Sequence, residues 1–263
     1  MKKPLYILKI GGKVLSDPVQ CNSLLEAFSK IDGPKILVHG GGKTGTEVAE
    51  KLGVEAKMIE GRRITDEAML EVAMMVYGGL MNKGVVAQLQ ALGENAIGLT
   101  GADMDVIRSI KRPVKEIDYG FAGDIVKVND LRLLSLLEEG ILPVMAPLTH
   151  DGKGQMLNTN ADTIASTVAR SMAKHFEVHL IYSFEMSGVL KDPSDQDSLI
   201  PLLEPSSYER YKAEGIIAGG MIPKLDNAFS ALASGVHRVY ICHSSAIGGL
   251  NRNTFRGTQI FLS

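Results

Sequence analysis

The sequence predicts an α/β protein, a three-layer α/β/α sandwich built around a mainly parallel open sheet. Short continuous apolar runs, such as 5–8 and 36–38, are typical of strands buried on both faces. Segments of helical spacing follow these runs, and that βαβα order places helices on the two faces of a parallel sheet. Glycines come directly after the first two strands, at the sheet edge where ligands bind in open α/β sheets.

The first half of the chain alternates strands and helices. Asp17 followed by Pro18 is typical of a helix start. Thr65 followed by two acidic residues is typical of another. The predicted strands are 5–8, 36–38 and 96–99; the predicted helices are 17–31, 44–52 and two between 65 and 93 that are separated by Gly78-Gly79; and β-hairpins are predicted within 103–128.

The second half of the chain repeats this alternation. Asp151-Gly152 is typical of a hairpin turn, and 158–162 is rich in helix-capping residues. The predicted helices are 131–137, about 160–173, 208–214 and 223–235; the predicted strands are 141–146, 178–183, 239–241 and an edge strand over 257–261. No linker or repeat interrupts the chain, so we expect one domain, 1–263, with an N-terminal lobe of about 1–174 and a C-terminal lobe of about 175–263.

Composition excludes several classes of protein. The 263 residues are 45% hydrophobic and 22% charged, with a net charge of −2, which is typical of a globular protein and not of a nucleic-acid-binding protein. No run approaches the roughly 18 apolar residues of a membrane span. Cys21 and Cys242 lie in apolar surroundings without a disulfide pattern, which favours a reducing cytoplasm.

Two glycine-rich turns are candidate anion sites. Lys9 precedes Gly11-Gly12 at the end of the first strand, and 40–45 follows the second strand. Adjacent glycines let backbone N–H groups approach a phosphate closely, although a solvated lysine before an ordinary turn is the alternative. A P-loop is excluded because Leu37 stands where the first glycine is needed. The dinucleotide fingerprint G-x-G-x-x-G does match 40–45, with Glu60 downstream, but Glu60 does not end a clear strand.

Two further residues are candidates at helix starts. Asp162 follows Asn158 and Asn160 in a segment where capping alone accounts for such residues. Lys224 follows a Gly-Gly-Met-Ile-Pro segment and falls in a first turn, where the helix dipole disfavours a cation unless an anion lies nearby. An exposed, solvent-screened lysine is the alternative. The six histidines show neither metal-ligand spacing nor a catalytic triad, and no chemistry is assigned to them.

Lysines, glycine-rich backbone and one acid, without a general base, fit phosphoryl transfer to a carboxylate. A carboxylate with a pKa near ~4.3 is already ionised at pH 7, so no proton has to be removed. The difficulty is to bring two anions together. Positive groups and Mg²⁺ on the transferring phosphoryl group reduce that difficulty.

The order of the motifs resembles that of N-acetylglutamate kinases of the amino acid kinase superfamily, over essentially the whole chain. The segments that carry the resemblance are Lys9-Ile10-Gly11-Gly12, His39-Gly40-Gly41-Gly42, Gly61-Arg62-Arg63-Ile64-Thr65, Asn158-Thr159-Asn160-Ala161-Asp162 and Gly220-Met221-Ile222-Pro223-Lys224. The resemblance implies the amino acid kinase fold and the phosphorylation of the side-chain carboxylate of N-acetyl-L-glutamate by ATP and Mg²⁺, the second step of arginine biosynthesis.

The resemblance also implies residue roles. Lys9 and Lys224 would stabilise the transition state, and Asp162 would hold both lysines in place. Mg²⁺ would be bound mainly by the phosphates of ATP and not by a metal site of the protein. Backbone N–H groups of Gly11, Gly12, Gly41 and Gly42 would contact phosphoryl and substrate carboxylate. Arg63 and Asn158 would bind the amino-acid end of the substrate. The nucleotide would be bound in the C-terminal lobe by Glu185, Met186, Ser187, Gly188, Val189, Leu190, Ile216, Ile217 and Ala218.

Two residues depart from the family pattern. Glu185 stands where the family usually has aspartate, which leaves the nucleotide contacts open. Arg62 stands where the family usually has an apolar residue. An arginine beside the acyl group would find a bidentate partner in a succinyl carboxylate, so N-succinyl-L-glutamate is an alternative substrate. The other reading is that Arg62 faces solvent.

The resemblance further implies an assembly. Arginine-inhibited family members carry an N-terminal helical extension that joins dimers into hexamers, and here Lys9 is close to the first residue. We therefore expect a homodimer, with its contact in the N-terminal lobe, that arginine does not inhibit. Two other functions stay open: an NAD(P)-binding oxidoreductase built on 40–45, and a non-catalytic sensor of arginine or a nucleotide on the same fold.

Overall fold

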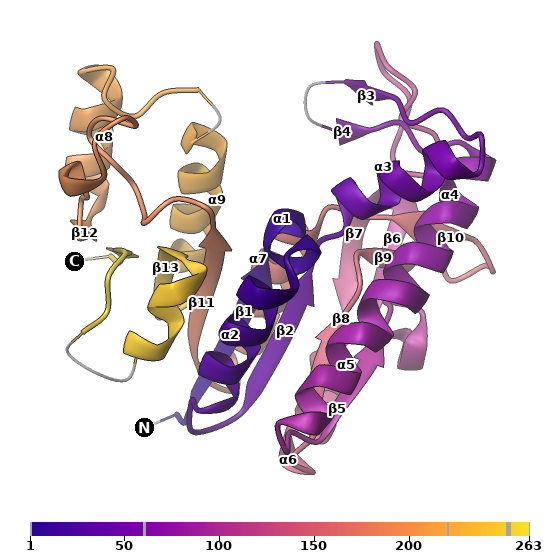
Figure 1. Cartoon of the computed structure of the whole chain (residues 1–263), viewed down its shortest axis with the longest axis horizontal. Coiled ribbons are helices and arrows are strands. Elements are labelled where there is room, and N and C mark those ends of the chain that lie inside the picture. Colours follow the sequence, from indigo (N-terminus) through magenta and orange to yellow (C-terminus); the bar gives the residue numbers. More distant parts are fainter. Residues whose placement is uncertain (1, 60–61, 220, 251–253, 263) are drawn as a thin grey trace.

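A computed structural model describes residues 2–59, 62–219, 221–250 and 254–262, without the side chains of Arg62 and Pro223. In this part of the chain, an eight-stranded sheet forms the centre of the molecule (Figure 1). In order across the sheet, its strands are β12 (Leu202–Leu203), β14 (Thr258–Ile260), β13 (Arg238–His243), β11 (Glu177–Phe184), β1 (Pro4–Ile10), β2 (Lys35–His39), β8 (Leu142–Met145) and β5 (Ala96–Leu99). Parallel pairing from β13 to β5 confirms the predicted mainly parallel sheet.

Helices cover both faces of this sheet, as the alternation of strands and helices predicts. One face packs its strands against α6 (Asp130–Glu138), α7 (Ala161–Met172) and α9 (Met221–Ala233), with a core that includes Leu5, Ile7 and Leu180. The other face packs against α2 (Pro18–Ser29) and α5 (Asn82–Ala91), with a core that includes Leu8 and Ile10. Because side chains alternate along a strand, β1 contributes to both cores. The three-layer α/β/α architecture is confirmed.

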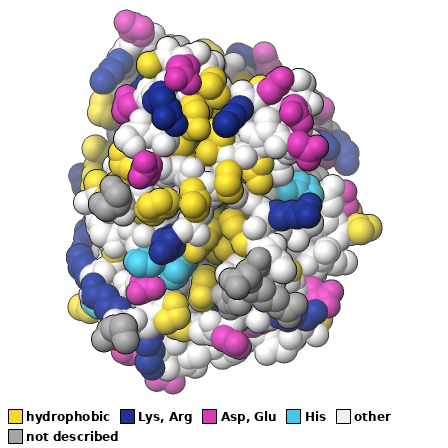
Figure 2. Space-filling model, turned by 90° about the vertical axis from the view of Figure 1, so that its left-hand side faces the viewer, with side chains coloured by type: hydrophobic (Ala, Val, Ile, Leu, Met, Phe, Trp, Pro, Cys, Tyr) yellow, Lys and Arg dark blue, Asp and Glu magenta, His cyan; other side chains and the backbone are white. Residues whose placement is uncertain are grey.

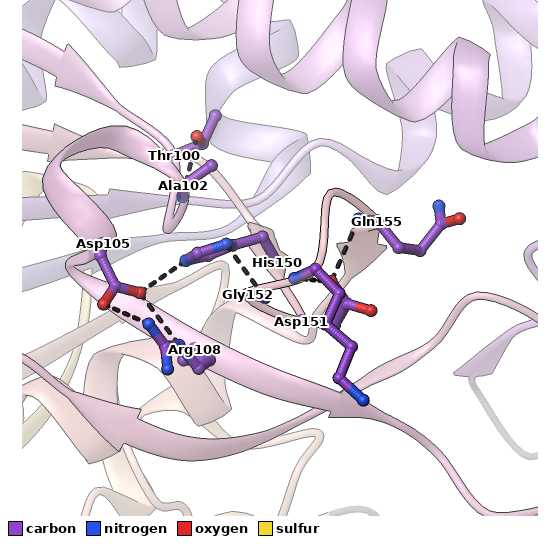
Figure 3. Close-up of polar contacts among 9 residues, drawn as sticks. Thr100, Ala102, Asp105, Arg108, His150, Asp151, Gly152 and Gln155 are labelled. Atoms are coloured by element: carbon purple, nitrogen blue, oxygen red, sulfur yellow. Dashed lines mark hydrogen bonds and ion pairs between the residues drawn. The ribbon is translucent and has the colours of Figure 1, made fainter.

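Two smaller sheets lie beside the central one. The antiparallel pairs β6 (Ile107–Lys111)–β7 (Gly123–Val128) and β9 (Leu148–His150)–β10 (Met156–Asn158) form a four-stranded sheet, as predicted for 103–128 and for the turn at 151–152. Asp105 joins the two hairpins by accepting hydrogen bonds from Arg108 and pairing with His150 at 2.8 Å (Figure 3). The short pair β3 (Met58–Ile59)–β4 (Arg62–Arg63) was not predicted.

Four sequence predictions are wrong in detail. Gly78-Gly79 does not separate two helices, because the π-helix η1 (Met74–Met81) continues α4 (Glu67–Ala73) directly into α5. The strand at 258–260 is not an edge strand: β14 lies between β13 and β12. The turn after β1 opens a short helix, α1 (Gly12–Ser16), and α9 starts at Met221 rather than 223.

The remaining helices connect the sheet strands. They are α3 (Gly42–Lys51), α8 (Pro205–Ala213), and the short 3₁₀ segments η2 (Asp103–Asp105), η3 (Gln196–Ser198) and η4 (Ser244–Gly249). Among the described residues, none of the helices is both long and apolar enough to cross a membrane. The central sheet runs through both expected lobes, and the division near residue 174 stays a prediction.

Candidate active site

The carboxyl ends of β1, β2 and β11 meet at one edge of the central sheet (Figure 1). Lys9 lies on the same face of β1 as the core residues Leu5 and Ile7, because side chains alternate along the strand. That face is covered by α7 and α9. The Lys9 side chain is therefore directed under two helix starts, and only 7% of the residue is exposed.

Asp162 provides the partner of this buried cation. It lies in the first turn of α7, which Asn160 caps by accepting a hydrogen bond from the backbone N–H of Thr163 at 3.0 Å. The Asp162 Oδ1 atom is 2.7 Å from Lys9 Nζ. Capping is thus performed by Asn160, and the Asp162 carboxylate forms the ion pair with Lys9.

Lys224 joins this pair from the start of α9. Its Nζ lies 4.1 Å from the centre of the Phe184 ring, and Lys9 Nζ lies 5.3 Å from the same centre. Phe184 ends β11 on the face that also carries Tyr182, and the two rings stack with centroids 6.0 Å apart. Both lysine ammonium groups are therefore within cation–π distance of one aromatic ring.

Burial and charge set the pKa of Lys224. Burial lowers this pKa below the ordinary lysine value; the Asp162 carboxylate opposes the shift, and the Lys9 ammonium adds to it. The two amines, Asp162 and Phe184 therefore form one electrostatic unit at the sheet edge. We call Lys9, Asp162, Phe184 and Lys224 the lysine cluster.

Two glycine-rich helix starts face each other beside the lysine cluster. Gly11 precedes α1 and Gly41 precedes α3. A Cβ atom added at Gly12 would lie 3.6 Å from the backbone nitrogens of both Gly41 and Gly42. Backbone N–H groups at the starts of the two helices thus converge, an arrangement that favours bound anions.

Arg63 and Asn158 meet around the segment that follows β4. Arg63 donates to the Gly42 carbonyl at 2.8 Å and to Thr46 Oγ1 at 2.7 Å, so its guanidinium group lies at the start of α3. Asn158, at the end of β10, donates to Thr65 Oγ1 at 3.0 Å. The structure thus places Arg63 beside the converging glycines, and Asn158 beside Thr65, two residues further along the chain. The side chain of Arg62 and the motif glycines Gly61 and Gly220 lie outside the described part of the chain. What the sequence predicts for them therefore stays a prediction.

A cavity of about 320 Å³ extends from the lysine cluster into the C-terminal part of the molecule. Of the residues predicted to bind the nucleotide, three line it: Glu185, Met186 and Gly188. Gly11, Gly12, Phe184 and Lys224 line it as well. Glu185 also forms an exposed ion pair with Lys13, with Lys13 Nζ 2.8 Å from Glu185 Oε2.

The other predicted nucleotide residues do not line this cavity. Val189, Leu190 and Ile217 are buried, and Val189 and Ile217 belong to the core under α7 and α9. Ser187 donates to Gln196 at 3.0 Å, Ile216 is half-buried and Ala218 is exposed. A larger cavity, of about 590 Å³, lies at the amino ends of the strands beside Lys35 and Glu94. The converging lysines and glycines, and not the cavity volume, therefore locate the site.

Sequence reasoning missed the residues that support the site. Phe184 could have been found, because it shares the alternation of Val178, Leu180 and Tyr182 on the face of Lys9. Buried Asn82 donates to His39 Nε2 at 3.1 Å and to the Val144 carbonyl at 2.9 Å; no local pattern shows that contact.

Comparisons with known proteins show which family this chain resembles. Residues 4–243 match the model of the amino acid kinase family. The chain is 59% identical over 247 residues to the acetylglutamate kinase of Phocaeicola vulgatus, covering 94% of this chain and 96% of the relative. It is 54% identical over 260 residues to the acetylglutamate kinase of Bacteroides fragilis, covering 99% and 98% of the two chains.

A solved structure shows the same fold. N-acetylglutamate synthase from Neisseria gonorrhoeae, complexed with coenzyme A and N-acetyl-glutamate, superposes with a TM-score of 0.81 at 24% identity. The match covers 98% of this chain and 59% of that chain. At this identity the likeness concerns the fold alone.

Proposed function

The chain belongs to the amino acid kinase family, and we propose that it has the activity of an acetylglutamate kinase. It transfers the γ-phosphoryl group of ATP to the side-chain carboxylate of N-acetyl-L-glutamate, the second step of arginine biosynthesis. Relatives with this activity in their names are 52–59% identical over nearly the whole chain. The observation that carries the proposal is the convergence of Lys9 and Lys224 on Phe184, beside the glycine-rich starts of α1 and α3.

The reaction forms a bond between a carboxylate oxygen of the substrate and the γ-phosphorus, and breaks the bond between that phosphorus and the β,γ-bridging oxygen of ATP. The ionised carboxylate needs no general base. Negative charge spreads over the transferring phosphoryl group, so the ammonium groups of Lys9 and Lys224 stabilise the transition state more than the ground state. Asp162, paired with Lys9 at 2.7 Å, keeps that amine in place.

We place the acyl-glutamate in the N-terminal lobe and the nucleotide in the C-terminal lobe. N–H groups of Gly11, Gly12, Gly41 and Gly42 would contact the phosphoryl group and the acceptor carboxylate, while Arg63 and Asn158 would bind the amino-acid end. ATP would enter the cavity lined by Glu185, Met186 and Gly188, and Ser187, Val189, Leu190 and 216–218 would complete its site.

Mg²⁺ would neutralise phosphate charge and would be held mainly by the phosphates. The two carboxylates nearest the site fit this secondary role, because Asp162 is paired with Lys9 and Glu185 with Lys13. The cytoplasm, where ATP is abundant, is the compartment that this proposal assumes.

A hydroxylamine assay tests the activity. The protein is incubated with MgATP, hydroxylamine and either N-acetyl-L-glutamate or N-succinyl-L-glutamate, with Lys9→Ala as the inactive control. An acyl phosphate gives a hydroxamate, which neither an oxidoreductase nor a sensor forms. We expect hydroxamate from the acetyl compound; its absence with both compounds would refute the kinase. If the native protein instead has a higher kcat/KM for the succinyl than for the acetyl compound, and Arg62→Leu loses this preference, N-succinyl-L-glutamate is supported as the substrate.

A further inference from the structure

A group of potential metal ligands lies at the amino end of β11, opposite the lysine cluster. Glu177 is the first residue of β11, and His179 lies two residues later on the same face of the strand. The backbone N–H of His237, just before β13, donates to the Val178 carbonyl at 3.0 Å. Two neighbouring strands thus bring one carboxylate and two imidazoles together, although the sequence separates them by about sixty residues.

The distances from the carboxylate of Glu177 to the two imidazoles match those around a tetrahedral ion. Glu177 Oε1 is 3.4 Å from His179 Nε2 and 3.5 Å from His237 Nε2. All three potential ligand atoms lie within 4.8 Å of one another. Ligands roughly 2.0–2.2 Å from a tetrahedral Zn²⁺ are about 3.3–3.6 Å apart, so one ion would fit with small side-chain movements.

The surroundings of His179 hold its imidazole in one orientation. The ring stacks on Tyr6 with centroids 5.0 Å apart, and its Nδ1 atom lies 3.3 Å from the Tyr240 hydroxyl. With Nδ1 beside that hydroxyl, the Nε2 atom faces Glu177. An outer partner of this kind is typical of metal-binding histidines.

We propose that Glu177, His179 and His237 bind one Zn²⁺ or a similar late transition-metal cation, with water as the remaining ligand. Two nitrogen ligands favour such ions over Mg²⁺, which prefers oxygen. The ion would connect the start of β11 to the segment before β13. Since Glu177 and Phe184 are the two ends of β11, the site is roughly 23 Å from the lysine cluster. It therefore acts on stability and not on phosphoryl transfer.

Arg238 competes with an ion at this site. Its Nε atom donates a hydrogen bond at 3.4 Å to His237 Nε2, which is the atom that would bind the metal. Removing the guanidinium group removes both a competing donor and a positive charge. We therefore expect Arg238→Gln to bind metal more tightly than the native protein.

Calorimetric titration of the metal-free, full-length protein with Zn²⁺, in millimolar Mg²⁺ and without ATP, tests this site. We expect saturable binding of one Zn²⁺ per chain and a higher Tm on binding. His237→Ala should weaken binding at least tenfold. Glu177→Gln should also weaken it, which keeps the test valid if one variant misfolds. His243→Ala is the matched control, because His243 ends β13 at the opposite sheet edge.

The expected ranking of affinities is Arg238→Gln above native and His243→Ala, and these above His237→Ala and Glu177→Gln. Absence of stoichiometric binding to the native protein would refute the site. So would equal binding by native protein and His237→Ala, or an equal loss in His243→Ala.

Discussion

At the scale of the residue, Phe184 has the most specific consequence for catalysis. It contacts the ammonium groups of both Lys9 and Lys224, and these contacts offset part of the repulsion between the two charges. A cation–π contact contributes about 0.5–2 kcal/mol, so Phe184→Leu should lower kcat roughly 2- to 30-fold while KM changes little. Steady-state kinetics of the kinase reaction measure this effect.

Fluorinated phenylalanines at position 184 separate electrostatics from shape. Successive fluorination weakens the negative face of the ring with little change in volume, so kcat should fall stepwise. Fluorination of Phe255, which packs edge-on against Tyr240 with centroids 5.3 Å apart, is the control. An unchanged kcat through the Phe184 series would show that the ring only fills space.

The pKa of Lys224 predicts a pH profile. The proposed mechanism uses its ammonium form, and burial lowers this pKa below the ordinary value of about 10.4. Activity should therefore fall on the alkaline side at a lower pH than an ordinary lysine would give. Asp162 raises the pKa of Lys224, so Asp162→Asn should move this fall to still lower pH, besides lowering kcat strongly.

Measurement of kcat against pH in native protein and in Asp162→Asn tests this prediction. Glu185→Gln is a graded control, because Glu185 raises the pKa of Lys224 less than Asp162 does. An alkaline limb at the same pH in all three proteins would mean that Lys224 does not control it.

Buried His39 predicts a loss of stability on acidification. Burial lowers its pKa from 6.5 to about 4, although a hydrogen bond to the Gly40 carbonyl opposes the shift. Asn82 donates to His39 Nε2 and is held by the Val144 carbonyl, so a protonated ring would place two donors face to face.

The unfolded chain therefore takes up a proton at His39 near pH 6.5, and the folded chain only near pH 4. Stability is fully present above pH 6.5 and falls between pH 6.5 and 4, by about 3 kcal/mol from this group. Urea unfolding at several pH values measures the loss, and NMR of the His39 ring measures its pKa. A folded-state pKa near 6.5 would contradict the prediction.

At the scale of the element, η1 fixes the position of the glycine turn after β2. Tyr77 and Met81 face Gly41, where an added Cβ atom would lie 2.6 Å from Tyr77 Cδ1 and 2.8 Å from Met81 Sδ. Gly41→Ala should therefore displace η1 or the start of α3, lower the free energy of unfolding by about 1–3 kcal/mol and raise KM for the acyl-glutamate.

Gly79→Ala is the matched control within η1. A Cβ atom at Gly79 would meet nothing within 4 Å, so this variant should be neutral or slightly more stable. Chemical denaturation and steady-state kinetics compare the two variants. Equal effects would mean that the contact with Gly41 does not position the turn.

At the scale of the whole molecule, the two sheet edges differ. At one edge, η1 exposes 54% of Met75 and 63% of Leu80, and Ile97 of β5 is 38% exposed. Lys83 donates to the Gly98 carbonyl at 3.1 Å, which joins the helix after η1 to β5. The other edge is β12, which is only two residues long. On that side of the molecule, hydrophobic side chains form a band with charged side chains around it (Figure 2).

We infer that the β5 and η1 side forms a homodimer contact, because apolar side chains of a helix lie there beside β5, the outermost strand of the sheet among the described residues. Leu80→Glu should give a monomer, while Leu202→Glu on β12, 59% exposed in the native chain, should leave the dimer intact. Light scattering measures the masses. A monomeric native protein, or a dimer unaffected by Leu80→Glu, would exclude this contact.

The sequence by itself determined the layered fold and the positions of the candidate site residues along the chain. Apolar runs and helical spacing are local properties, so they predict β1, β2, α7 and the three layers correctly. Lys9, Asp162 and Lys224 could be selected because each stands at a strand end or a helix start. The resemblance to a kinase family, now shown by the family match, rested on the order of such segments.

Only the tertiary structure decided which of these residues meet. Lys9 and Asp162 are 153 positions apart, and their 2.7 Å contact depends on how α7 packs on β1. The contact of both lysines with Phe184, and the grouping of Glu177 and His179 with His237, depend on strand order. The π-helical continuation through Gly78-Gly79 likewise depends on packing, which overrides the weak helix propensity of glycine. Contacts between distant segments arise from burial of the whole core, and no local pattern encodes them.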